Sequence, residues 1–98
     1  MEALNKKLWN AVRNEDVDLV LDCLHKGADL HYEDDDGRTP LHLAAETGST
    51  EVTKVLVEAG ASLSAVDKQG KTPHNVAQDN VKKLLQDWEH RLQTGKLA

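Results

Sequence analysis

Acidic side chains form the strongest candidate site for chemistry in this chain. Glu33, Asp34, Asp35 and Asp36 are consecutive, and Asp29 lies just before them. Adjacent carboxylates repel one another, and that cost is tolerated more readily where a basic partner neutralises them. Two interpretations stay open: a site for a basic protein surface, or a solvated loop that only aids solubility. Calcium binding is a third and weaker one, because the spacing lacks the glycine and distal glutamate of an EF-hand loop.

Other reactive residue types do not form a catalytic or metal-binding pattern. The five histidines are scattered, without a cysteine or carboxylate at the spacing that zinc sites use. Cys23 lies beside Val20 and Leu24 on an apolar helical face, which is typical of a buried, unreactive thiol. We therefore expect no enzyme, no cofactor and no metal. A metal-dependent hydrolase using the acidic run would need a deep pocket, which a loop tip does not offer.

Composition limits the class of protein further. The chain has 98 residues, enough for one domain, with 39% apolar and 30% charged residues. A net charge of −5 disfavours nucleic-acid and anionic-membrane binding and suits a basic protein partner. The single cysteine excludes an internal disulfide and favours a reducing compartment. Without a long apolar run or a secretory signal, we expect an intracellular protein, cytoplasmic or nuclear, with an organelle left open.

Apolar residues recur at helical spacing along most of the chain. The helices are expected within residues 4–13, 17–24, 41–45, 52–57, 73–78 and 81–92. Glycines follow several of these segments, as is typical of helix C-termini. The last segment predicts a long amphipathic helix. The acidic run therefore belongs to a connection between two helices.

A Thr-Pro pair begins two of these helices and marks an internal repeat. Thr39-Pro40 and Thr72-Pro73 each supply an N-cap side chain and a proline that fits the first helical turn. When residues 27–44 are aligned with 60–77, at an offset of 33, eight of eighteen pairs are identical. Roughly one identity is expected for unrelated segments of average composition. Such a period indicates stacked units that each cannot bury their apolar face alone.

The segment 37–48, GRTPLHLAAETG, resembles the ankyrin repeat signature almost letter for letter. Residues 58–63, EAGASL, look like that family's helix end and hairpin entry. The resemblance covers residues 4–92 and departs from the family pattern in two places. KKLWNA at 6–11 replaces TPLHLA in the first unit, and His74-Asn75 replaces Leu-His in the third. Polar substitutions are expected in terminal units, whose outer faces meet water.

The resemblance implies an all-α fold, an ankyrin-repeat α-solenoid of stacked helix-turn-helix units with projecting β-hairpin-like fingers. We expect one domain over residues 1–93, followed by a flexible tail over 94–98. Its parts would be an N-terminal capping repeat (4–36), a full repeat (37–69) and a C-terminal capping repeat (70–93).

The resemblance also implies which residues hold the fold and which bind a partner. The structural framework positions are Gly37, Thr39, Pro40, His42, Gly48, Gly60, Gly70, Thr72 and Pro73. The imidazole at the position of His42 hydrogen-bonds around the Thr-Pro turn in this family and braces the finger against the helix. Finger tips and exposed inner-helix positions bind. With the two residues before Asp34 added, the expected binding set is Arg13, Asn14, Tyr32, Glu33, Asp35, Asp36, Arg38, Glu46, Thr47, Lys68, Gln69, Lys71 and Gln78.

The aromatic residues allow more than one role. Tyr32 replaces the small residue usual at its hairpin position, so it either anchors an interface or packs against the neighbouring finger. Trp9 takes the place of the motif histidine in the first unit, and Trp88 lies on the apolar stripe of the last helix. We expect both tryptophans to be structural and to cover the ends of the stack. Asp34 matches a framework aspartate and is expected to cap the finger turn.

These patterns predict a non-catalytic protein–protein interaction module, an adaptor, docking subunit or stoichiometric inhibitor that is a monomer on its own. Its concave face and acidic finger would meet a partner with a basic surface patch, while Arg38, Lys68 and Lys71 would contact acidic groups on the same partner. The alternative is a permanently assembled structural subunit of a larger complex. Such a subunit should be poorly stable alone, and the sequence does not decide between the two.

Overall fold

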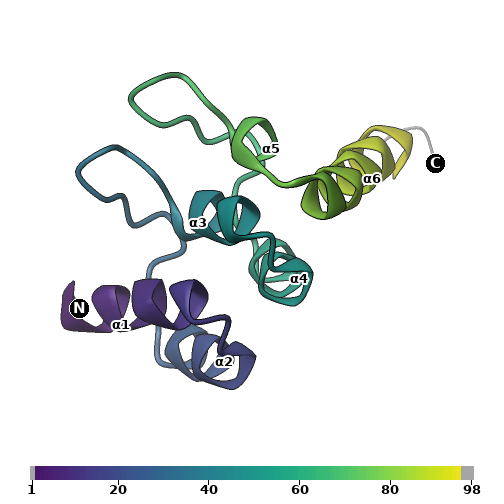
Figure 1. Ribbon diagram of the computed structural model, residues 1–98. Coiled ribbons are helices and arrows are strands. Elements are labelled where there is room, and N and C mark those ends of the chain that lie inside the picture. Colours follow the sequence, from purple (N-terminus) through teal and green to yellow (C-terminus); the bar gives the residue numbers. More distant parts are fainter. Residues whose placement is uncertain (1, 96–98) are drawn as a thin grey trace.

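The protein is described by a computed structural model, which covers residues 2–95 and the side chains of residues 3–88. The described residues form helices and no strands, in three stacked pairs (Figure 1). The pairs are α1 (Glu2–Arg13) with α2 (Val17–His25), α3 (Pro40–Thr47) with α4 (Thr50–Glu58), and α5 (Pro73–Val76) with α6 (Asp79–Gly95). We call α1, α3 and α5 the inner helices and the others the outer helices.

Two long connections project from the same side of the stack. Finger 1 (residues 28–38) links the first pair to the second, and finger 2 (residues 61–71) links the second to the third. Both fingers extend beyond the inner helices, one above the other (Figure 1). The observed architecture is therefore the expected all-helical solenoid with projecting fingers.

The helix ends follow the local chemistry of the sequence. Thr39 caps α3: its Oγ1 accepts a hydrogen bond from the His42 amide at 3.3 Å, and Pro40 occupies the first turn. Thr72 caps α5 in the same way, accepting from the Asn75 amide at 3.2 Å. These caps satisfy amides that have no partner within the helix. The Thr-Pro pairs thus begin both inner helices at the predicted positions.

The apolar core is divided into two clusters of unequal size. The larger joins α1, α2, α3 and α4 and contains Leu8, Val12, Val20, Leu41 and Leu56, all without exposed surface. The smaller contains Ala45, Ala77, Val81 and Leu85, with Trp88 packed against it; these four are its only buried members among the described side chains. Within residues 3–88, the third pair therefore has a smaller buried apolar cluster than the first two pairs share.

Polar bonds join the third pair to the second where the chain between α5 and α6 is short. The Gln78 amide donates to Ala45 O at 3.2 Å, and its side chain donates to Glu46 O at 3.1 Å. The Asn80 side chain donates to Gly48 O at 3.0 Å. Gly48 has φ +78°, and a Cβ there would lie 3.1 Å from Gln78 Cδ. A glycine is thus needed both for the turn and for this contact.

The C-terminal ends of both helices in the third unit differ from the sequence-based expectation. The inner helix ends at Val76 instead of residue 78, because Ala77 is extended and the Gln78 amide bonds to the second pair. Helix α6 includes Thr94 and Gly95, where the sequence predicts a flexible tail; residues 96–98 lie outside the described residues. No helix within residues 2–95 has the length and apolar character needed to cross a bilayer.

Replacing Trp88 by alanine should lower the free energy of unfolding by about 2 kcal/mol, less than for a fully buried tryptophan because Trp88 is partly exposed. Urea denaturation followed by circular dichroism would measure the loss. Leu21→Ala is the matched control, since Leu21 is 48% exposed on an outer helix and should change stability by less than about 1 kcal/mol. Equal effects of the two changes would contradict a capping role for Trp88.

Candidate functional site

Each finger is shaped by one aspartate at the same repeat position. Asp34 Oδ1 accepts hydrogen bonds from the amides of Asp36 and Arg38, both at 2.9 Å. Asp67 Oδ1 accepts from the amides of Gln69 and Lys71, at 2.8 and 2.9 Å. These side-chain bonds act together with a backbone bond across each tip, from the Asp34 amide to Arg38 O at 3.0 Å and from the Asp67 amide to Lys71 O at 2.9 Å. The fingers are therefore fixed turns without strand structure.

These bonds also set the ionisation of the two aspartates. Partial burial alone would raise the pKa of the Asp34 carboxyl, but the hydrogen bonds from Arg38 and Asp36 outweigh it and lower the pKa below its ordinary value. The pKa of Asp67 is lowered as well, chiefly by the hydrogen bond from the Lys71 amide. Both groups are thus held as carboxylates in the folded protein.

A buried histidine connects the second inner helix to the second finger. His42 Nδ1 lies 3.2 Å from the Thr39 amide and 2.9 Å from Thr39 Oγ1, while its Nε2 lies 2.8 Å from Lys71 O. Because an amide can only donate, Nδ1 must accept, and Nε2 therefore carries the proton that it donates to the carbonyl. The imidazole ties the start of α3 to finger 2.

The two fingers also contact each other directly. The Lys68 amide donates to Asp36 O at 3.0 Å. Gly37 has φ +76°, and a Cβ at this position would lie only 3.1 Å from Lys68 N. The close approach of the fingers therefore depends on a glycine in finger 1.

Arg38 sits at the centre of an ion-pair network inside the predicted binding surface. Its Nε lies 3.0 Å from Asp34 Oδ2, its Nη1 3.1 Å from Glu46 Oε2, and its Nη2 4.0 Å from Asp36 Oδ2. The side chain is 31% exposed. Much of its capacity to contact acidic groups on a partner is therefore used within the protein.

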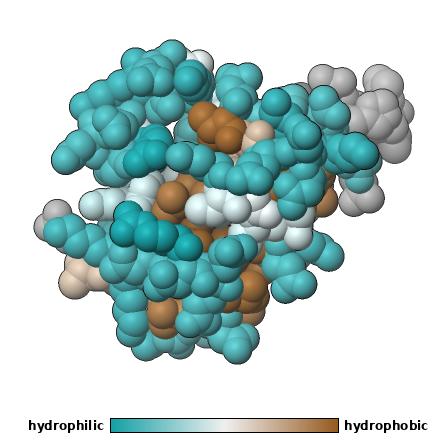
Figure 2. Space-filling model, viewed as in Figure 1, coloured by the Kyte–Doolittle hydropathy of each residue, from teal (hydrophilic) through white to brown (hydrophobic). Residues whose placement is uncertain are grey.

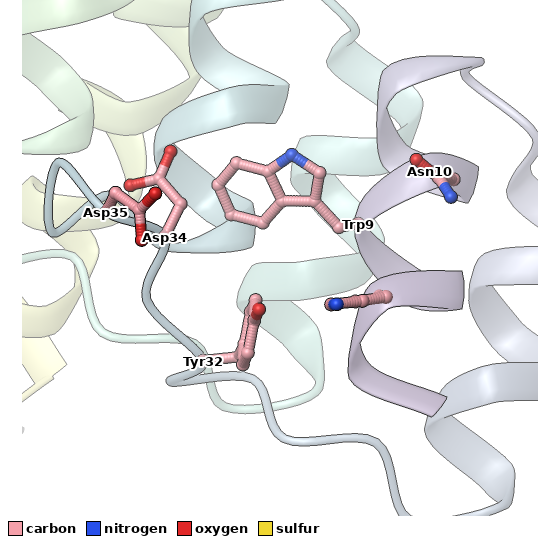
Figure 3. A pocket seen from close by; sticks show the side chains of 6 residues that line it. Trp9, Asn10, Tyr32, Asp34 and Asp35 are labelled. Carbon is pink, nitrogen blue, oxygen red and sulfur yellow. The ribbon is translucent and has the colours of Figure 1, made fainter. Parts of the chain in front are cut away.

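Two hollows open on the side that carries the fingers. We call the first the aromatic hollow; it has a volume of about 400 Å³ and is lined by Lys6, Trp9, Asn10, Tyr32, Asp34 and Asp35 (Figure 3). We call the second, of about 470 Å³, the charged hollow; it is lined by Asp36, Arg38, Glu46, Asp67, Lys68, Gln69, Lys71 and Val76. The surface is indented and mostly polar between the fingers, with apolar patches inside the recess (Figure 2).

The structure brings most of the predicted binding residues to these hollows. Tyr32 and Asp35 line the aromatic hollow; Asp36, Arg38, Glu46, Lys68, Gln69 and Lys71 line the charged one. The remaining predicted residues line neither hollow. Arg13, Asn14 and Glu33 are exposed, Thr47 Oγ1 donates to Ala44 O, and Gln78 bonds to the second pair.

Sequence reasoning missed the contribution of α1 to the aromatic hollow. Lys6 and Asn10 were not among the predicted binding residues, and Trp9 was expected to be only structural. Trp9 is 8% exposed, and its ring meets the Tyr32 ring edge to face, with centroids 6.2 Å apart. The one available signal was KKLWNA at residues 6–11, where the first unit departs from the repeat motif. Among the described side chains, those of residues 3–88, no three His, Cys, Asp or Glu groups are placed to hold a metal ion.

Comparison with known proteins agrees with this architecture. The family described as ankyrin repeats (3 copies) matches residues 8–94, so the chain belongs to the ankyrin repeat family. The match confirms the resemblance found in the sequence. Ankyrin repeats are in general protein–protein interaction modules without catalytic activity.

Similar regions occur in proteins of very different size. The chain is 42% identical over 73 residues to the potassium channel KOR1 of Oryza sativa subsp. japonica, which is 74% of this chain and 8% of the channel. It is 38% identical over 74 residues to the human 2-5A-dependent ribonuclease, 74% of this chain and 10% of the ribonuclease. It is 30% identical over 79 residues to the human protein phosphatase 1 regulatory subunit 27, 81% of this chain and 51% of that subunit. The chain thus spans about half or less of these relatives.

The lowered pKa values of Asp34 and Asp67 predict a specific loss of stability in acid. The stability that the two carboxylates contribute is fully present above the unfolded-state pKa of about 4 and is lost as the pH falls through the lower folded-state pKa. The double variant Asp34→Asn/Asp67→Asn should therefore be less stable than the wild type at pH 7, and the gap should narrow at pH 2.5.

Urea denaturation at the two pH values measures this gap. Asp35→Asn is the control, because the Asp35 carboxylate makes no hydrogen bond or ion pair within the described side chains. A gap that stays constant with pH would show that the finger aspartates do not stabilise the fold through their charge.

Proposed function

We propose that the chain is a non-catalytic protein-binding module that grips one partner protein with the two fingers and the inner helices. It would act as an adaptor, a docking subunit or a stoichiometric inhibitor. The single observation that carries this proposal is the pair of fingers, which are hydrogen-bonded to each other and carry charged side chains that are exposed to solvent.

The fingers differ in charge, which defines the chemistry of the partner. Finger 1 contains five carboxylates and one guanidinium, whereas finger 2 contains one carboxylate and two ammonium groups. Asp35 and Asp36 are exposed in finger 1, as are Lys68 and Lys71 in finger 2. A complementary partner presents a basic patch to finger 1 and an acidic group to finger 2. Such complementarity steers association and selects the partner.

Preorganisation supports the same function. The Asp34 and Asp67 turns, the Lys68 amide bond to Asp36 O and the His42 bond to Lys71 O all restrict finger motion before any partner arrives. A surface that is already ordered loses less conformational entropy on docking than a flexible one. The similarity to the human protein phosphatase 1 regulatory subunit 27, of which this chain spans about half, supports a regulatory form of the proposed function.

Neutralising the tip of finger 1 should slow association with the partner. Affinity purification with the intact chain, repeated with Asp35→Asn/Asp36→Asn, would identify a protein that depends on the finger. With that protein immobilised, the variant should associate about ten-fold more slowly at low salt, with a flatter salt dependence of the rate.

The control Asp18→Asn/Glu51→Gln removes the same charge from the outer helices α2 and α4. It should change the association rate by less than about two-fold if the fingers steer docking. Equal rates for wild type and both variants would place the interface elsewhere. Equal slowing by both variants would show that the association rate depends on the net charge of the protein and not on the fingers.

A further inference from the structure

We propose that the aromatic hollow is the receptor for an arginine side chain of the partner protein. The inference rests on the proposed binding function and deepens it, because it assigns one residue of the partner to one place on this chain. The hollow lies between α1 and finger 1, at the edge of the proposed binding surface (Figure 3).

Two aromatic rings form a fixed wall of the hollow. Trp9, from α1, belongs to the larger core cluster, and Tyr32, from finger 1, packs against that cluster; the two rings meet at an interplanar angle of 73°. The side chains are therefore held before a ligand arrives. Aromatic faces attract cations, tryptophan most strongly, and a planar guanidinium can also stack on them. Tryptophan, tyrosine and arginine are also the residues that carry most of the energy in protein interfaces.

A carboxylate without an internal partner completes the site. Figure 3 shows Asp34 and Asp35 together on finger 1, on the side of the indole away from Asn10. Asp34 is already bound by Arg38 and by two amides. Asp35 has no basic group within ion-pair distance among the side chains of residues 3–88. It can therefore accept a forked pair of hydrogen bonds from a guanidinium, which an ammonium cannot supply.

Among the described side chains, Lys6 is the cation that lines the hollow, and it makes the assignment easier to test. Its exposed ammonium repels an incoming cation but can move aside on a flexible stem. Removing it should therefore strengthen binding of arginine. Removing the charge of Asp35 should therefore weaken the binding of arginine, and removing that of Lys6 should strengthen it. If these exposed side chains only supported the fold, the two changes would not have opposite effects. The volume of about 400 Å³ lies within the usual range of ligand pockets, and Lys6, Asn10 and Asp35 among the lining residues are exposed to solvent.

The test uses small probes and needs no partner protein. N-acetyl-arginine amide is titrated into the 15N-labelled chain, with the neutral isostere N-acetyl-citrulline amide and N-acetyl-lysine amide as controls. The expected result is a saturable change in the NMR chemical shifts of the Trp9 indole N–H and the Asn10 side-chain amide. The arginine probe should produce this change at a lower concentration than either control probe. Trp88→Phe assigns the two indole signals. Asp35→Asn should weaken this binding roughly two- to five-fold, and Lys6→Ala should tighten it by a similar factor.

Several results would overturn the assignment. Equal binding of arginine and citrulline amides would exclude charge recognition, and equal binding of arginine and lysine amides would exclude guanidinium recognition. Shifts spread over the acidic surface, or unchanged by Asp35→Asn and Lys6→Ala, would remove the hollow as the site. Glu51→Gln, on an outer helix, should leave the affinity unchanged.

The two proposals fail in different ways. If the chain captures a partner that depends on Asp35 and Asp36 but the arginine probe does not reach Trp9, the arginine receptor is wrong and the binding module stands. If the probe binds at Trp9 as expected but no protein depends on the fingers, the receptor stands as a site and the proposed binding function fails.

Discussion

The hydrogen bond from the His42 imidazole to the Lys71 carbonyl is the contact on which the arrangement of the fingers depends. It starts at the cap of α3, where the Thr39 amide and hydroxyl fix Nδ1, and it ends 29 residues later in finger 2. The α3 end of this bridge is shielded from water, since Thr39 and His42 are both buried, whereas the bond to Lys71 O in finger 2 is only partly buried. A buried, fully satisfied polar group of this kind specifies one arrangement and penalises others, because any alternative leaves unpaired donors.

The repeat position of His42 carries a different residue in each unit, and each residue suits the finger that follows its helix. In the first unit Trp9 meets finger 1 through the Tyr32 ring, so an apolar contact replaces the hydrogen bond. In the third unit Asn75 accepts from the Thr72 amide at 3.0 Å, which preserves the cap. No further finger follows α5 within the described residues, so the shorter side chain has no carbonyl to reach. Trp9, at the position of His42 in the second unit, is also one of the residues that line the aromatic hollow.

Periodicity made much of this fold predictable. The 33-residue offset, the Thr-Pro pairs and the glycine stops located the helices and the fingers, because these depend on backbone preferences that recur in each unit. Two features escaped prediction. Lys6 and Asn10 lie in the first unit, where it departs from the repeat, and they join the aromatic hollow only through the position of finger 1. Arg38 was among the predicted binding residues, but its ion pairs with Asp34 and Glu46 within the protein were not predicted. Such pairings depend on the distance in space between side chains of neighbouring elements. That distance cannot be read from the spacing of residues along the sequence.

The most direct test of the account is amide hydrogen exchange in the His42→Asn variant. Asparagine keeps the cap, as Asn75 does in the third unit, but is too short to reach Lys71 O. The account predicts that the finger 2 amides of Gln69 and Lys71 exchange roughly ten-fold faster, while the amides of α1 and α2 change much less. Unchanged exchange in finger 2, or equal acceleration throughout the chain, would contradict the claim that finger 2 depends on this bond.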